Sequence, residues 1–254
     1  MSVKILLPAA IAVIALPAAA WADGCRARAD RHADIDAAGA DRVEIVAGAG
    51  DLEVQGASDT KAVHATGRAC AYSDEDLARI NLSIERDGST IRVVAEIPPG
   101  TDEAYLDFRV ELPAGLPVKI TDSSGDINVK KVAALDLRDS SGDIEINDVP
   151  GKLMLEDSSG DLYVTDAGDV DVMSDSSGDI RISHVQSVRI DVDSSGEINV
   201  RDVKGNVIIG DDSSGSIDVS DVAGDFSVAH DGSGDIDYSN ISGRVSVPDN
   251  KHSD

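Results

Sequence analysis

Aromatic residues are scarce in this sequence, and basic residues are far fewer than acidic ones. Its 254 residues include two Phe, one Trp and four Tyr, so aromatics make up 3% of the chain. Sites for carbohydrates and for stacked nucleic-acid bases normally present exposed aromatic rings, so this scarcity disfavours both kinds of ligand. Lys and Arg number 22 against 48 Asp and Glu, which gives a formal charge of −26. A field of that sign repels nucleic acid and anionic lipid surfaces and favours solubility.

Only one apolar run is long enough to suggest targeting, and it lies at the N-terminus. A short basic start (1–4) precedes the apolar stretch "ILLPAAIAVIAL" (5–16), and small residues follow at Ala20 and Ala22. This pattern predicts a secretory signal peptide over residues 1–22. The run is short and broken by proline, which disfavours the alternative of an uncleaved membrane anchor. We therefore expect an exported protein, periplasmic or extracellular, with no membrane span in its mature chain.

The two cysteines, Cys25 and Cys70, both follow the predicted signal peptide. Exported chains fold in an oxidising compartment, so we predict one disulfide between them. The alternative is lipid attachment at Cys25, which the acidic Asp23 just before it disfavours. On the chain-entropy model, a closed loop of this length stabilises the fold by about 4 kcal/mol.

One short motif, by contrast, is abundant. DSSGD begins at Asp122, Asp139, Asp157 and Asp175, and it weakens to DSSGE at Asp193, DSSGS at Asp212 and DGSGD at Asp231. These starts are 17, 18, 18, 18, 19 and 19 residues apart. Each copy is followed by alternating apolar residues, such as Ile144 and Ile146, which indicate a strand with one buried face. A near-constant period of this kind indicates a repeat architecture.

Each repeat unit contains two such strands and two corners, which is one coil of a β-solenoid. At the DSSG corner, the Asp can accept a backbone hydrogen bond from two residues on, and the Gly can be left-handed. The other corner carries an inward apolar residue (Val132, Val149, Ala167, Val185, Val203, Val222, Ile241). Five glycines that follow it are expected to need positive φ: Gly151, Gly168, Gly205, Gly224 and Gly243.

We therefore predict an all-β fold, a single-chain β-solenoid of about seven coils of 17–19 residues, stacked at roughly 4.8 Å. The alternative is a sandwich of hairpins, which would not explain the uniform columns of like residues. Repeats occupy 119–247, a polar tail 248–254, and a β-rich cap region 23–118. The cap would cover the open end of the stack, whose unpaired strand would otherwise invite aggregation.

Within the cap region, "DRVEIVAGAGDLEV" (41–54) contains a faded copy of the repeat and is a candidate first coil. Strands are expected within 62–70, 80–97 and 104–115, with a hairpin turn at Arg86-Asp87-Gly88-Ser89. A Ser cap followed by acidic residues predicts a short helix within 73–80.

A signal peptide, a GDLEV strand, the segment "VELPAGLPVKI" (110–120) and tandem SSGDI units together resemble one family of bacterial proteins. These are the exported β-strand-repeat "putative adhesins", related to auto-transporter-adhesin head domains. The resemblance covers nearly all of the mature chain and implies export and a β-solenoid. It implies no catalytic activity. This sequence shows no translocating barrel and no cell-wall sorting tail, which disfavours a role in surface adhesion itself.

Acidic residues should form two columns along the stack, and these are the candidate metal ligands. Neighbouring carboxylates about 5 Å apart repel by ~1 kcal/mol in water and by more in a less polar setting. Turn amides, solvent or bound Ca²⁺ could offset that repulsion. The spacing departs from the nine-residue calcium β-roll code, so turn capping is the simpler interpretation. The candidates are Asp122, Asp126, Asp139, Asp143, Asp157, Asp161, Asp175 and Asp179.

Two enzyme classes fit the sequence less well than a structural role. "GDDSSGS" (210–216) resembles a serine-protease loop, but it is one of seven equivalent corners and the five histidines are scattered. A polysaccharide-acting β-helix would need long loops, and the units are compact. We therefore predict no catalytic or cofactor-binding residues and a non-enzymatic cell-envelope structural or adhesin-like interaction module. Its partner would be an unidentified envelope protein or surface component, with end-to-end self-association as a further option.

Overall fold

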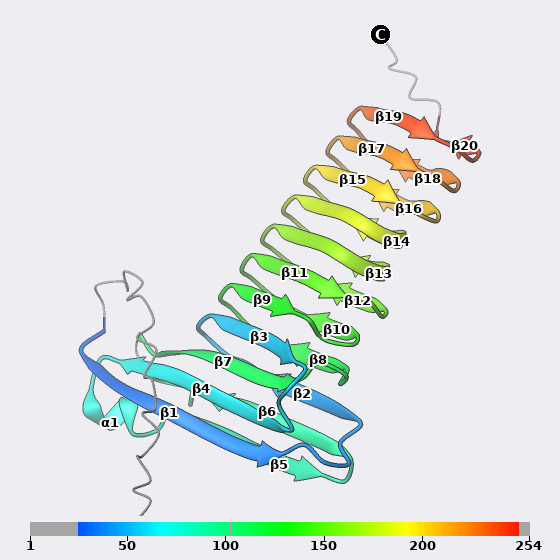
Figure 1. The fold of residues 1–254 in the computed structure, drawn as a ribbon. Coiled ribbons are helices and arrows are strands. Elements are labelled where there is room, and N and C mark those ends of the chain that lie inside the picture. Colours follow the sequence, from blue (N-terminus) through cyan, green and yellow to red (C-terminus); the bar gives the residue numbers. More distant parts are fainter. Residues whose placement is uncertain (1–24, 102, 249–254) are drawn as a thin grey trace, which may run out of the picture.

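The computed structural model describes residues 25–101 and 103–248. The predicted signal peptide and residues 249–254 of the predicted tail lie outside the described residues. The fold is the predicted β-solenoid: short strands stack as parallel coils along one axis, and a broader sheet region lies at the N-terminal end (Figure 1).

The repeat units form two parallel sheets that face each other across the core. One sheet contains β9 (Ile127–Lys130), β11 (Ile144–Val149), the first part of β13 (Leu162–Ser174) and of β14 (Ile180–Asp193), β15 (Ile198–Val203), β17 (Ile217–Val222) and β19 (Ile236–Ile241). The other contains β8 (Val118–Thr121), β10 (Leu135–Arg138), β12 (Leu153–Glu156), the last part of β13 and of β14, β16 (Val207–Asp212), β18 (Phe226–Asp231) and β20 (Val245–Ser246). In two units the expected pair of short strands runs through its corner as one continuous strand, β13 or β14.

The register places like residues above like. Ile144 pairs with Ile127 in the coil before and Leu162 in the coil after, and all three side chains are buried. One coil alone could not bury its apolar face, so the stacked array is the folding unit. The inward assignment made from the alternation is confirmed in the first six units, except that Ala167 is only partly buried. It is not confirmed in the last coil, where Ile236, Ile241, Val245 and Val247 are only partly buried and Tyr238 is 50% exposed.

The faded repeat in the N-terminal region joins the stack out of sequence order. It forms β2 (Arg42–Val46) and β3 (Leu52–Ala57). Leu52 of β3 pairs with Ile127 of β9 on one side and with Phe108 of β7 (Tyr105–Pro113) on the other. On the opposite sheet, β2 lies between β8 and β6 (Thr90–Glu96). A segment that precedes the first full repeat by many residues therefore forms the coil against which that repeat stacks.

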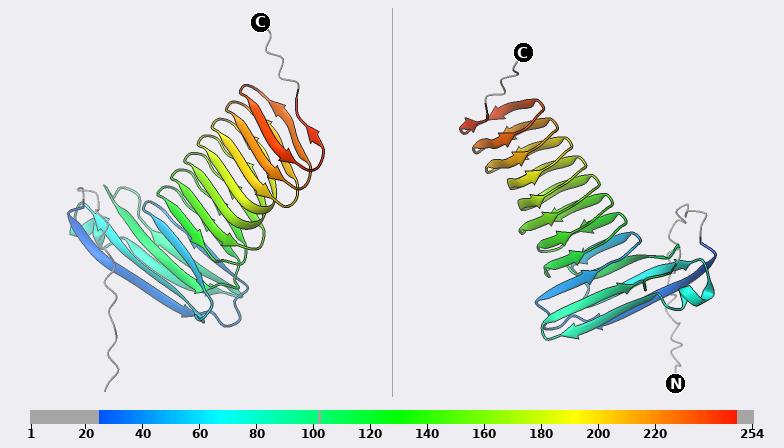
Figure 2. Two further views of the ribbon diagram at one scale, coloured as in Figure 1. Left: turned by 45° about the horizontal axis from the view of Figure 1, so that its top comes forward. Right: turned by 180° about the vertical axis from the view of Figure 1, so that it is seen from behind.

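The rest of the N-terminal region extends both sheets with antiparallel strands. β1 (Ala27–Asp36) pairs with β4 (Ala62–Ala71), which pairs with β7, and β5 (Asn81–Asp87) pairs with β6. The short helix α1 (Asp74–Leu77) has Ser73 as its N-cap, as predicted. Figure 2 shows this broader region continuing the stack at its first coils. Cys25 and Cys70 form the predicted disulfide, which ties the residues before β1 to β4.

The prediction that five corner glycines need positive φ is wrong. The left-handed residues lie two or three positions earlier, at Asp148, Asp166, Asp202 and their equivalents, with φ between 53° and 58°. Asp and Asn tolerate this conformation because their short polar side chains bond locally. The glycines are needed for close packing instead. A Cβ on Gly224, for example, would lie 2.5 Å from the carbonyl oxygen of Gly205 in the preceding coil.

Candidate functional site

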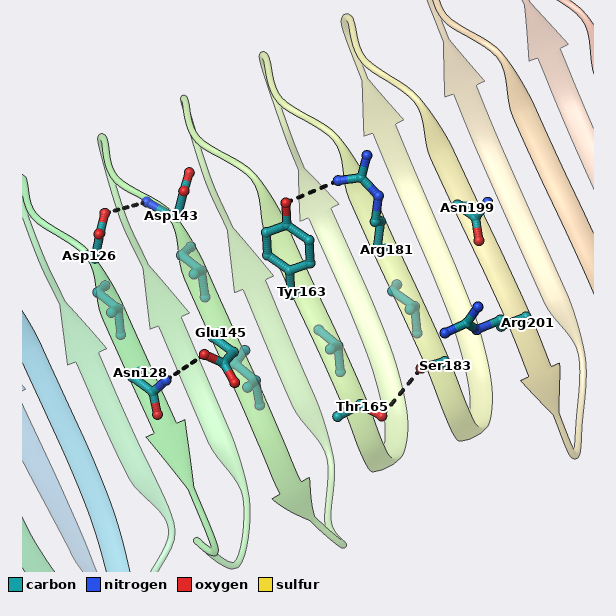
Figure 3. Close-up of a pocket in the computed structure, with 15 residues that line it drawn as sticks. Asp126, Asn128, Asp143, Glu145, Tyr163, Thr165, Arg181, Ser183, Asn199 and Arg201 are labelled. Carbon is teal, nitrogen blue, oxygen red and sulfur yellow. Dashed lines mark hydrogen bonds between the residues drawn. The ribbon is translucent and has the colours of Figure 1, made fainter.

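The outward face of β9, β11, β13, β14 and β15 carries a shallow hollow with a volume of about 860 Å³. Its floor is the regular sheet, and its outward side chains come from the same position of successive coils, so they form polar rows along the stack (Figure 3). The polar lining residues are Asp126, Asn128, Asp143, Glu145, Tyr163, Thr165, Arg181, Ser183, Asn199 and Arg201.

Tyr163 and Arg181 form the centre of this surface. The Arg181 guanidinium carbon lies 5.4 Å from the centroid of the Tyr163 ring, within the range of a cation–π contact. Arg181 Nη1 donates to the Tyr163 hydroxyl at 3.1 Å, and Arg181 Nη2 donates to Asp179 Oδ2 at 2.8 Å. The Tyr163 hydroxyl in turn donates to Asp161 Oδ2 at 2.7 Å, and this bond raises the pKa of Tyr163.

The neighbouring rows pair in the same coil-to-coil manner. Asn128 Nδ2 donates to Glu145 Oε2 at 2.7 Å, and Ser183 Oγ donates to Thr165 Oγ1 at 3.3 Å. Arg201 reaches from β15 toward Ser183 (Figure 3). The residues that line the hollow thus present hydrogen-bond donors and acceptors on its outward side.

The first of the two predicted acidic columns lies inside the DSSG corner. Its members in the first six units are at most 6% exposed: Asp122, Asp139, Asp157, Asp175, Asp193 and Asp212. Burial raises the pKa of Asp122 and Asp193 to about 7 and that of Asp157, Asp175 and Asp212 to about 6. It also raises the pKa of Asp139. As predicted, serine amides serve as turn donors to some of them. The Ser159 and Ser177 amides donate to Asp157 and Asp175.

The second column lies at the outer edge of the same corner and joins one coil to the next. The amide of Asp143 donates to Asp126 Oδ1 at 3.0 Å, and the amide of Asp161 donates to Asp143 Oδ1 at 2.9 Å. The same bond links Asp179 to Asp161 and Glu197 to Asp179. The hydrogen bond that Asp161 accepts from the Asp179 amide is the main reason that the pKa of Asp161 is lowered. These carboxylates are thus used as inter-coil hydrogen-bond acceptors.

The eight candidate metal ligands therefore divide into two sets with different surroundings. Asp122, Asp139, Asp157 and Asp175 are buried, and Asp126, Asp143, Asp161 and Asp179 line the corner's outer edge. Within the parts of the chain that the structure describes, no three His, Cys, Asp or Glu side chains converge in a way that could hold a metal ion.

The serine and glycine residues of the motif also make contacts between successive coils. Ser159 Oγ donates to the carbonyl of Ser140 in the preceding coil, and Ser177 Oγ does the same to Ser158. In the protease-like segment, Ser214 Oγ likewise donates to the Ser194 carbonyl. Gly196 has φ +137°, and a Cβ there would lie 1.7 Å from the Gly178 carbonyl oxygen. Each DSSG corner is thus stacked directly on the one before it.

Sequence reasoning found the acidic columns but missed that one of them is buried. The sequence gives only a weak indication of this burial. Asp193 lies three residues after the inward Ile190, an odd number, because the chain turns the corner between them. Period-2 alternation alone would have assigned the inward position to Val192, which is 40% exposed.

Residues 32–195 match the Toastrack DUF4097 family. The chain belongs to this family. The Toastrack match covers the N-terminal region and the first units of the array, including most of the polar hollow. No curated protein matches the chain. Across residues 25–101 and 103–248, no helix has the length and apolar character needed to cross a bilayer.

Several solved structures are similar at low sequence identity. A "putative adhesin" from Bacteroides fragilis NCTC 9343 is 13% identical, with 89% of this chain and 99% of that chain covered and a TM-score of 0.48. A "putative adhesin" from Parabacteroides merdae ATCC 43184 is 15% identical, with 86% and 96% covered and a TM-score of 0.47. A "putative lipid binding protein" from Parabacteroides distasonis ATCC 8503 is 18% identical, with 86% and 96% covered and a TM-score of 0.45.

Proposed function

We propose that this protein is an exported, non-enzymatic module of the cell envelope that binds another envelope protein through the polar face over β9, β11, β13, β14 and β15. One observation carries the proposal. Polar side chains recur in register along a regular sheet face and line a shallow hollow of about 860 Å³. The SSGDI repeats, through their resemblance to adhesin-type exported proteins, support the same role.

An extended polypeptide segment suits this face best. Successive coils rise at about the spacing of neighbouring strands, so a segment lying along the stack would meet the polar side chain of a new coil roughly every 4.8 Å. Tyr163, which is 37% exposed, provides a flat apolar surface, while Arg181 and Arg201 provide donors to backbone carbonyls. The chain's formal charge of −26 favours a partner with basic residues.

Export is tested by the mass of the protein recovered from cells that express the full chain. We expect a mature product of residues 23–254 outside the cytoplasm, with Cys25 and Cys70 oxidised. A full-length product that retains the first 22 residues in the membrane fraction would contradict the proposed export.

The binding face is tested by placing a photo-cross-linking residue at Ser183 in one variant and at Met154 in another. Ser183 lies in the hollow, and Met154 is 38% exposed on the opposite sheet, so the second variant is the matched control. We expect one discrete cross-linked envelope protein from the Ser183 position, lost when Tyr163→Ala and Arg201→Ala are added. Equal cross-linking from both positions, or no effect of these substitutions, would contradict the assignment of the face.

A further inference from the structure

The buried aspartates of the DSSG corner form one continuous column along the inside of the solenoid. Asp193 pairs in register with Asp212, and Asp212 pairs with Asp231. An isolated bridge joins Asp175 to Asp193 in the same way. Neighbouring parallel strands lie about 4.8 Å apart, so each carboxyl has another directly above or below it.

The six carboxyl groups from Asp122 to Asp212 each have at least one buried oxygen without a hydrogen-bond donor. At Asp122, Asp193 and Asp212, both side-chain oxygens are buried and accept no hydrogen bond of good geometry, although serine amides close by partly offset the burial. At Asp139, Asp157 and Asp175, one side-chain oxygen is likewise buried and accepts no hydrogen bond. A buried acceptor without a donor is costly, and a buried charge without a partner is more so.

The group within reach of such an oxygen is the next carboxyl in the column. Asp122 and Asp139 lie within hydrogen-bonding reach of each other, and so do Asp212 and Asp231. Two ionised carboxylates have no hydrogen to share, because both are acceptors. A carboxyl pair becomes a hydrogen-bonded pair only when one member carries a proton, as in paired carboxyl sites generally.

The charged groups that face the column from the packed elements are also acids. Asp51, from the loop between β2 and β3, acts on Asp122. Asp126 acts on Asp139, and Asp161 acts on Asp175, in addition to the neighbours within the column. The groups that act most strongly on Asp122, Asp139, Asp157, Asp175, Asp193 and Asp212 are thus other carboxyls and serine amides.

We propose that the column from Asp122 to Asp212 is a proton-binding ladder, in which neighbouring buried carboxyls share protons near neutral pH and the solenoid becomes less stable when those protons are lost. A proton needs no coordination shell. This matters because the column offers no cluster with the geometry of a metal site. The ladder would make the fold of the envelope module more stable in a mildly acidic medium than in an alkaline one.

The direction of the pH dependence follows from the raised pKa values of the column. In the unfolded chain these groups titrate near 3.9, whereas in the fold Asp122 and Asp193 titrate at about 7 and Asp157, Asp175 and Asp212 at about 6. Between about pH 4 and 7 the folded chain binds more protons than the unfolded chain, so stability falls as pH rises. The stability that these bound protons contribute is fully present near pH 4 and is lost as the pH rises above about 7.

Thermal unfolding of the mature chain between pH 5 and pH 8.5, at fixed ionic strength, tests the proposal. We expect the Tm to fall by on the order of 10 °C over this range. A Tm that is constant or that rises with pH would overturn the ladder.

Two Asp→Asn variants separate the column from the general acidity of the chain. Asp193→Asn places a neutral side chain of the same shape in the column, and Asp218→Asn makes the same charge change on the exposed face of the next coil. We expect Asp193→Asn to raise the Tm at pH 8.5 and to flatten its pH dependence, while Asp218→Asn leaves the slope unchanged. Equal effects of both variants would overturn the proposal, because they would show relief of net charge alone.

A direct titration makes the test independent of how the variants fold. In the wild-type chain labelled with ¹³C at the Asp side-chain carboxyl carbon, we expect the NMR resonances of several Asp residues to titrate between about pH 6 and 7. Titration of every Asp below about pH 4.5 would overturn the ladder. Melting at pH 8.5 with EDTA and with CaCl₂ completes the series. Recovery of the pH 5 stability with Ca²⁺ would show that a cation, not a proton, neutralises the column.

Discussion

Each residue of the DSSGD motif has a different structural role, although the motif looks like one low-complexity signal. The first Asp is buried in the corner, the second Ser donates to the preceding coil, and the last Asp accepts an amide from the next one. Gly196 shows why the motif needs its glycine. Its φ of +137° disfavours any side chain, and the carbonyl of Gly178 occupies the place of a Cβ.

We therefore expect Gly196→Ala to destabilise the fold by roughly 3 kcal/mol, since backbone strain and a close contact with backbone act together. Gly115→Ala is the matched control, because a Cβ at Gly115 would meet no atom within 4 Å. Urea unfolding of the two variants measures the difference. A similar loss of stability in both would mean that the corners adjust to side chains more easily than their stacking suggests.

A second test at this scale concerns the serine columns. Within the described part of the chain, the Ser158 hydroxyl is not one of the donors that link the coils, whereas its carbonyl accepts from Ser177 Oγ. We expect Ser158→Ala to change the free energy of unfolding by less than about 0.5 kcal/mol, as for an ordinary surface substitution. Loss of cooperative unfolding in this variant would show that the first serine of the motif contributes to folding directly.

At the scale of one strand, inward and outward positions alternate so sharply that adjacent isoleucines differ in role. Ile209 of β16 is fully buried, while Ile208 beside it is 39% exposed. We expect Ile209→Ala to cost 2–5 kcal/mol through lost burial and a cavity, and Ile208→Ala to cost less than about 1 kcal/mol. Equilibrium unfolding in urea compares the two. Equal costs would reject the inward assignment of this strand.

The same alternation explains which elements the sequence could predict. The strands from Ile144 onward repeat a local pattern, so period and spacing were enough to place them in a solenoid. β2 and β3 join the stack through partners far away in sequence, and their position depends on β6 and β7, which carry no repeat motif. The polar pairing of Tyr163 with Arg181 likewise depends on coil register. The burial of the aspartate column depends on how the chain turns at each corner.

For the molecule as a whole, the solenoid behaves as a one-dimensional array in which each coil contacts mainly its neighbours. The N-terminal region differs, because antiparallel strands and the Cys25–Cys70 disulfide hold it together. The disulfide joins residues 45 apart in sequence and lies at one end of the stack. Its contribution should therefore be felt most by the strands at that end.

Removing the disulfide with Cys25→Ser and Cys70→Ser should lower stability by about 4 kcal/mol on the chain-entropy model. Hydrogen exchange would locate the loss. We expect faster exchange in β1 and β4, with protection retained in β16 and β18, because few contacts link these distant parts of the array. Ile209→Ala should give the opposite profile, with the loss centred on β16. Uniformly faster exchange in the double cysteine variant would mean that the chain unfolds as a single cooperative unit and that the end strands control the whole stack.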